Sequence, residues 1–244
     1  MPDRIVELDY GREKRQTTAQ EHELGDLGYL RDGRFFRYIF MDGAVTSGKL
    51  LQQVANIAEH DMDLATAVAA IGVGTISATL GANDIAADEY KDGYIYVNDD
   101  VGEGQLFKIS SHAAVASSGV FAVPIRDEGG VRTALTAASL TGLMKNPYKD
   151  VIIAPTTHTG AIVGATVRDA SDNNYGWAQR AGIAALLIDG TVTIGEQVMR
   201  SNGTAGAVEA ADAAGTVENE IIGSVTLIVA VTTDYGLISM TLSP

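Results

Sequence analysis

Asp32-Gly33-Arg34-Phe35-Phe36-Arg37-Tyr38-Ile39-Phe40 is the stretch that decides the fold class. Its Asp-Gly pair is typical of a two-residue hairpin loop, because such loops need positive φ angles, which glycine adopts without steric cost. The run that follows is short, aromatic and β-branched, as strands are. The stretch therefore predicts a tight turn that leads into a β-strand.

The same pattern recurs along the rest of the chain. Further turn pairs are Asp42-Gly43, Asp92-Gly93, Asp189-Gly190 and Asn202-Gly203. Further strands are expected at Tyr94–Val97, Leu106–Ile109, Val151–Ile153, Ile162–Val163, Ala185–Ile188, Val225–Val231 and Leu237–Met240. Since the crossover helices of a parallel α/β fold are missing, the pattern predicts a mainly β protein whose antiparallel sheets form a sandwich or a barrel.

Two short helices are expected beside the strands. Apolar residues recur at helical spacing within 50–58, although an extended linker is the alternative there. A second apolar stripe falls within Thr133–Leu143. Neither helix changes the fold class.

The chain is expected to fall into an arm and a two-part body. Residues 1–28 mix charges with Gln and Thr without periodicity, which predicts an extended N-terminal arm that clamps a neighbouring subunit. The body is divided into 29–145 and 146–244 by the turn residues Lys145-Asn146-Pro147-Tyr148. One continuous domain is the alternative.

Charge and cysteine usage exclude several classes of function. Against 17 Lys and Arg stand 31 Asp and Glu, a formal net charge of -14. Such a chain repels phosphate backbones, so a nucleic-acid partner is not expected. The absence of cysteine excludes disulfides, thiolate nucleophiles and thiolate metal sites.

No membrane partner or export signal is expected either. The first residues are charged and lack the apolar core of a signal peptide. Leu64–Ala82 has no charged residue, but its Ala, Gly and Thr make it too weakly hydrophobic for a membrane span. It is interpreted as buried strands. The absence of cysteine fits assembly in a reducing cytoplasm.

Gly43-Ala44-Val45-Thr46-Ser47-Gly48-Lys49 is the sequence closest to a cofactor-binding motif. It has the spacing of a phosphate-binding loop up to its lysine, but Leu50 stands where a Ser or Thr hydroxyl would hold magnesium. An ordinary turn is the preferred interpretation, a nucleotide-binding enzyme the alternative. No cofactor is expected.

Neither metal nor catalytic chemistry is expected from the remaining polar residues. The histidines, at positions 22, 60, 112 and 158, lack the spacing of a zinc site, and Ser110-Ser111-His112 has no nucleophile elbow around it. Carboxylates and amides cluster within 169–174 and 98–100, and Asp61 lies close to Asp63. These residues suit turns, with a calcium loop as the alternative.

The aromatic residues supply the candidate contact surface. Tyr175 and the only tryptophan, Trp177, alternate in an expected strand and share one face. A platform for sugar stacking is one interpretation, and a core or subunit contact is preferred. The candidate subunit-contact residues are Tyr175, Trp177, Phe35, Phe36 and Tyr38.

The order of five phrases resembles a family of tailed-phage virion proteins, the head decoration or capsid-associated structural proteins. These phrases are Asp32–Tyr38, Gly48–Gln52, Val97–Gln105, Asn146-Pro147-Tyr148 and Tyr175–Gln179. The resemblance covers most of the chain and implies many identical copies on a capsid, often as trimers, without catalytic residues.

The expected function is therefore that of a structural virion protein, not an enzyme, that decorates or cements the outer surface of a phage head. Its partners would be the major capsid protein and further copies of itself. A tail or neck component and a carbohydrate-binding module are the alternatives. A shell-forming protein is disfavoured because long helices are lacking.

Overall fold

The computed structural model describes residues 5–211, 220–228 and 233–243, and it is mainly β, as predicted. The one helix in these ranges is the 3-10 helix η1 (Arg12–Lys14). The chain forms two compact units. The first, here called the split unit, contains the residues up to Val54 and those from Pro147 onward, and the second, the inserted unit, is Ala55–Asn146.

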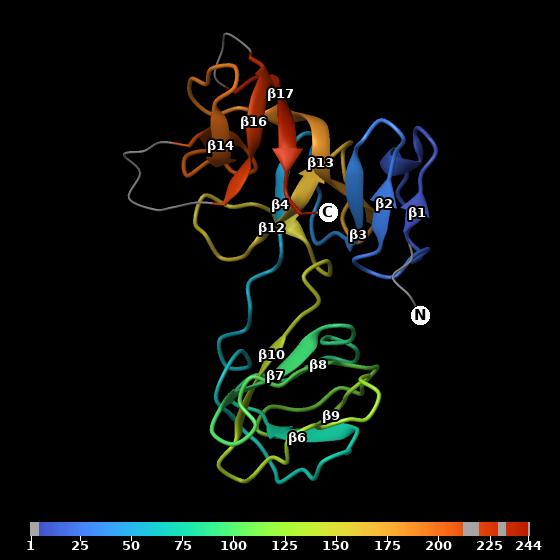
Figure 1. Cartoon of the computed structure of the whole chain (residues 1–244), viewed down its shortest axis with the longest axis vertical. Coiled ribbons are helices and arrows are strands. Elements are labelled where there is room, and N and C mark those ends of the chain that lie inside the picture. Colours follow the sequence, from blue (N-terminus) through green and yellow to red (C-terminus); the bar gives the residue numbers. More distant parts are fainter. Residues whose placement is uncertain (1–4, 212–219, 229–232, 244) are drawn as a thin grey trace. The chain divides into compact units, whose positions relative to one another are not determined.

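The split unit is built on an eleven-stranded sheet (Figure 1). Its strands are β1 (Val6–Glu7), β2 (Leu27–Tyr29), β3 (Phe35–Phe40), β4 (Leu50–Gln52), β11 (Ile152–Ile153), β12 (Ile162–Thr166), β13 (Tyr175–Leu187), β14 (Gln197–Arg200), β15 (Val208–Ala210), β16 (Ile221–Leu227) and β17 (Tyr235–Thr241). The main path runs β1-β2-β3-β13-β17-β16-β14-β15, while β12, β4 and β11 branch from β13. Among the named strands of this sheet, only β1 and β2 pair in parallel.

Part of this sheet closes on itself around an aliphatic core. Ile188 follows β13 directly and forms a parallel bridge with Val208 of β15. The pairing circuit from β13 through β17, β16 and β14 to β15 is thereby completed. Leu186, Ile222 and Ile238 are fully buried inside it, which explains why these strands are so rich in branched aliphatic residues.

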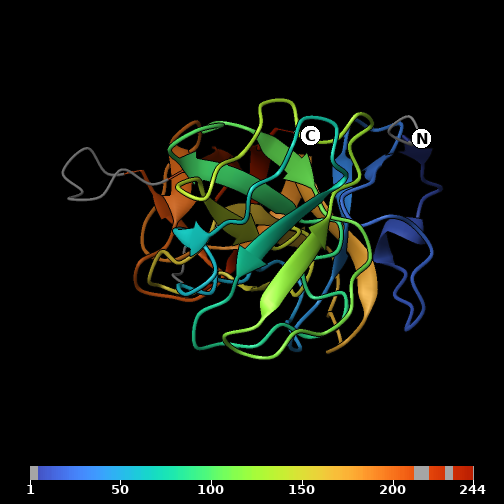
Figure 2. The ribbon, with the colours of Figure 1, turned by 90° about the horizontal axis from the view of Figure 1, so that it is seen from below.

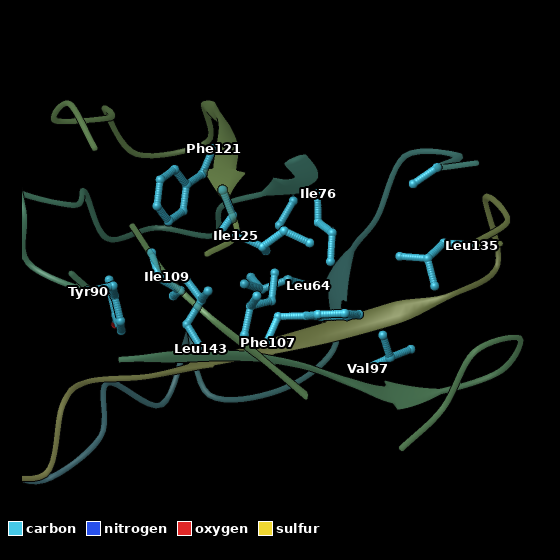
Figure 3. Packing of buried hydrophobic residues seen from close by; sticks show 14 of the residues in the cluster. Leu64, Ile76, Tyr90, Val97, Phe107, Ile109, Phe121, Ile125, Leu135 and Leu143 are labelled. Atoms are coloured by element: carbon cyan, nitrogen blue, oxygen red, sulfur yellow. The ribbon is translucent and has the colours of Figure 1, made fainter. Parts of the chain in front are cut away.

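The inserted unit is a small sandwich. One layer is the four-stranded sheet β5-β10-β7-β8 and the other is the pair β6-β9, which lies side by side in Figure 2. The strands are β5 (Leu64–Ala65), β6 (Thr75–Thr79), β7 (Tyr94–Asp99), β8 (Leu106–Lys108), β9 (Val120–Pro124) and β10 (Leu140–Met144). Ile76 and Phe121 of one layer point toward Phe107 and Leu143 of the other (Figure 3).

The division into units differs from the consecutive parts 29–145 and 146–244. The inserted unit ends at Asn146, one residue from the predicted division between 145 and 146. However, the residues before 55 belong to the same unit as those after 146. The register shows why: Ile152 of β11 lies opposite Gln52 of β4, so the chain leaves the sheet and returns to it on neighbouring strands. Such closely spaced ends allow a domain to be inserted without breaking the sheet.

Most of the expected strands are present, and β3 has the predicted bounds. The strand expected at Val225–Val231 is observed as β16, which begins earlier, while residues 229–231 lie outside the described ranges. A hairpin at Asp32-Gly33 joins β2 and β3, but its loop is longer than the two residues predicted, because the Leu30 N–H donates to the Arg34 carbonyl; Gly33 has φ 89°. The other turn pairs connect strands that are not neighbours or lie in longer connections, so they are turns without being two-residue hairpins.

Both helix predictions are wrong. Residues 50–52 form β4, and the following residues to 58 contain no helix. The segment 133–143 is a turn region that enters β10. In both places, tertiary pairing outweighed a short apolar stripe: Leu51 lies opposite Ile153 and Gly164, and Leu143 lies opposite Ile95.

The described part of the expected arm, residues 5–28, is packed and does not extend freely. It has little regular structure, as predicted, but β1 and β2 attach to the sheet and Leu8 is buried. The ring of His22 contacts Tyr38 and Trp177. This segment therefore covers the aromatic cluster of its own subunit, and nothing in it favours a clamp on a neighbour.

Adjacent phenylalanines of β3 test this packing. Phe36 is completely buried and Phe35 is half-buried on the opposite side of the strand. We expect Phe36→Ala to lower the free energy of unfolding by about 3–5 kcal/mol, because it removes a fully packed aromatic ring. Phe35→Ala is the matched control and should cost about 1 kcal/mol or less in urea denaturation. Equal losses would contradict the assigned orientation of the strand.

Candidate functional site

The resemblance to a phosphate-binding loop at Gly43–Lys49 does not extend to its geometry. A phosphate-binding loop presents free backbone N–H groups to the ligand, whereas here they are already bonded. The N–H of Gly43 donates to Asp172 Oδ1 and that of Ser47 donates to Asp169 Oδ1, both at 2.8 Å. β4, not a helix, follows the loop.

The carboxylate cluster within 169–174 has the complementary role. Its two aspartates accept the loop N–H groups, and Ala170 exchanges two backbone hydrogen bonds with Val45. Two features that each suggested a ligand site thus satisfy one another. The acidic residues act here as an internal counterpart to the anion that such a loop would otherwise bind.

The other carboxylates serve turns in the same way. The Asn98 side chain bonds to Asp63, and Asp99 and Asp100 accept the N–H groups of the residues that follow them. Throughout the described ranges, no three His, Asp or Glu side chains are grouped so that they would hold a metal ion.

The four histidines are scattered, and the two in the inserted unit are embedded in its core. His60 Nδ1 lies 2.9 Å from the Tyr90 hydroxyl, and His112 Nε2 accepts the N–H of Tyr90 at 3.0 Å. The Ser111 hydroxyl donates to Asp88, not to the imidazole of His112. These contacts hold the segment around Tyr90 in place, and burial raises the pKa of the Tyr90 phenol.

The candidate subunit-contact residues require a correction. Phe36, Tyr38 and Trp177 are buried in an aromatic cluster with Leu8 and Leu30, so their side chains cannot form a surface for a partner or a sugar. Gly28 lies so close to the Trp177 ring that a Cβ there would approach it to 2.7 Å. This close approach lets β2 cover the indole.

The remaining two candidates, Phe35 and Tyr175, are half-buried and stay open as contact residues. The Tyr175 ring is stacked on Tyr38 at a centroid distance of 6.0 Å, so one of its faces is occupied within the subunit. The aromatic residues of β3 and β13 are therefore mainly a structural cluster.

A surface that the sequence analysis missed lies on the inserted unit. The segments 64–83, 109–125 and 133–144 contain no Asp, Glu, Lys or Arg. Pairing of β6 with β9 and bridges from Thr66 to Ala78 and from Ala69 to Leu135 bring them together. The exposed parts of 67–75 and 113–122, with Ser77 and Thr79, are here called the neutral surface.

The neutral surface exposes branched aliphatic side chains. The exposed fractions are 73% for Val68, 68% for Ile71 and 64% for Val120, and the outward neighbours on β6 and β9 are Thr, Ser and Ala. Residues 64–82 were expected to be buried strands. Instead, Leu64, Ile76 and Leu80 are buried while most of 67–75 is exposed. Polar and apolar residues alternate in Thr75–Thr79, and this alternation predicts that one face of the strand points outward.

Such a surface is suited to contact with another protein. Charged groups lose hydration when an interface forms, and interface cores are depleted of them. In a chain of net charge -14, burying a charge-free surface with exposed Val and Ile removes no charged group from water. It is our candidate functional site.

Comparison with known proteins finds no relative that would identify the role of this surface. No family model, no curated protein and no solved structure matches the chain. Across the described ranges, no helix has the length and apolar character needed to cross a bilayer.

The closure of the loop by the acidic cluster is testable. We expect Asp169→Ala to lower the free energy of unfolding by about 1–2 kcal/mol, because it leaves the Ser47 N–H without its charged acceptor. Asp84→Ala removes the same charge from a residue of the inserted unit that is exposed like Asp169, and it should cost less than about 0.5 kcal/mol. Urea denaturation measures the free energy of unfolding of both variants. Equal losses would argue that the bond from Ser47 to Asp169 does not stabilise the loop.

Proposed function

We propose that this chain is a structural virion protein that decorates or cements the outer surface of a tailed-phage capsid by binding capsid subunits. The observation that carries the proposal is the neutral surface of the inserted unit within a strongly acidic protein. The five phrases that resemble phage decoration proteins support the same function.

The proposal assigns different tasks to the two kinds of surface. The neutral surface docks on the capsid lattice, where buried Val and Ile contribute hydrophobic free energy. The acidic remainder faces solvent and keeps many closely spaced copies from aggregating. Binding to assembled capsid alone stabilises the assembled state by mass action, which is the physical basis of a cement.

The proposal includes no catalysis. In the most enzyme-like motif, Gly43–Lys49, the N–H groups of Gly43 and Ser47 donate to the carboxylates of Asp172 and Asp169. The Ser111 hydroxyl and the His112 imidazole are each bonded to other groups. In the proposed structural role, copies of the chain associate with the major capsid protein and with one another as trimers.

Copy number distinguishes decoration from a tail or neck part. Quantitative mass spectrometry of purified virions from the phage that encodes this chain should find it at a stoichiometry close to that of the major capsid protein. A few copies per particle would instead assign the chain to the tail or neck and overturn the proposal.

A pair of isoleucines tests the docking surface. Ile71 on the neutral surface and Ile194 on the split unit are 68% and 67% exposed. We expect Ile71→Asp to weaken binding to heads lacking the native chain at least about tenfold, because a carboxylate would be buried in the contact. Ile194→Asp adds the same charge and should bind like the wild type. If both variants saturate heads equally, the neutral surface is not the docking surface.

A further inference from the structure

A groove lies on the outer face of the four-stranded sheet of the inserted unit, separate from the neutral surface on β6 and β9. Its volume is about 630 Å³, within the range of ligand-binding clefts. Its lining includes Asp61, Met62, Tyr94, Tyr96, Leu106 and Met144. All of these residues belong to the inserted unit.

The strand alternation of β7 produces the aromatic floor of the groove. Ile95 and Val97 point into the core, so Tyr94 and Tyr96 point outward from the same face. On the neighbouring strand β8, Leu106 is 58% exposed, and Met62, which also lines the groove, is 55% exposed. Unbranched methionine adapts its shape to different apolar partners.

One wall of the groove depends on a glycine of β10. The backbone at Asp61 crosses the sheet at Gly142, where a Cβ would lie 2.1 Å from the Asp61 carbonyl oxygen. The Tyr96 hydroxyl donates to that same oxygen at 2.7 Å. These contacts place the half-buried Asp61 beside the ring of Tyr96.

The two ends of the groove have charged groups of opposite sign. At one end, the Lys108 ammonium lies 5.7 Å from the centroid of the Tyr94 ring. At the other end is Asp61, whose carboxylate has no hydrogen bond or ion pair among the described residues. Burial, together with the carboxylates of Asp61 and Asp63, raises the pKa of Tyr96. The Tyr96 end is therefore acidic, and no Lys or Arg is among the described residues that line the groove.

We propose that this groove binds a protein segment that carries an arginine beside apolar side chains. The guanidinium pairs with the Asp61 carboxylate and lies against the Tyr96 ring, which combines an ion pair with a cation–π contact. The apolar neighbours pack on Met62, Leu106 and Met144. Charge complementarity selects this occupant, since the vacant end is negative and the opposite end already holds a lysine.

This site is independent of the capsid-docking proposal, because it lies on other strands and is tested on the purified chain. A random peptide library would be selected on the immobilised full chain, and an enriched peptide would then be titrated into protein labelled with ¹³C at its methionine methyl groups. The chain has six methionines, two of which line the groove. We expect enriched peptides to contain arginine and to shift the Met62 and Met144 signals.

Buried methionines and a charge-matched variant provide the controls. Met41, Met199 and Met240 are buried and should not shift. Asp61→Asn should raise the Kd about tenfold while leaving the fold intact, whereas Asp84→Asn, which removes the same charge at an exposed position, should not change it. Leu106→Asp should also weaken binding, without affecting the Asp61 backbone.

Several outcomes would overturn the proposal. They are enrichment of peptides without a basic residue, shifts confined to methionines outside the groove, an unchanged Kd in Asp61→Asn, and binding of a glycan array where no peptide is enriched. The last result would assign the tyrosines to sugar stacking.

Discussion

The split unit depends on strand β13, whose hydrogen-bonding partners change along its length. Its first half pairs with β3, and at Ala178 and Gln179 also with β12, while its second half pairs with β17. The change falls at a bulge between Gln179 and Ala181, and a bulge bends a strand and increases its twist. One continuous strand can therefore join the aromatic cluster around Trp177 to the aliphatic core around Leu186.

Arg180, inside this bulge, donates hydrogen bonds to backbone carbonyls of two other segments. Its Nη1 donates to the carbonyls of Ile162 and Val163, and its Nε donates to that of Ser243. Buried carbonyls need such donors, and guanidinium supplies several in a fixed geometry. Burial lowers the pKa of Arg180 from its ordinary value. The arginine thus ties β12 and the residues after β17 to the central strand.

The polar side chains of this protein are largely used within the fold. Asp169 and Asp172 close the loop before β4, and His60 and His112 hold Tyr90. The two proposed contact regions of the inserted unit differ in kind: one is a charge-free surface that includes β6 and β9, and the other is an aromatic groove over β7 that has Asp61 at one end. Large apolar contact suits a lattice of identical subunits, whereas a groove with a single charge suits one defined segment. The two surfaces lie on opposite layers of one sandwich, so their occupants need not compete.

The sequence by itself determined the fold class, since turn glycines and short aromatic or β-branched runs depend on local backbone preferences. Phe35–Phe40 and the Asp32-Gly33 hairpin follow from such preferences alone.

Tertiary structure decided the rest. The insertion of 55–146 depends on Gln52 and Ile152 meeting in a sheet, 100 positions apart in the numbering. Whether Trp177 is a contact or a core residue depends on β2 and His22 covering it. The neutral surface needs β6 and β9, which are 40 or more residues apart, to pair, and the groove needs the backbone at Asp61 to lie over Gly142 of β10. The alternation of residues shows which side chains share one face of a strand. Which of the two faces is exposed to water depends on pairing with strands far away in the sequence, and a local pattern does not contain that information.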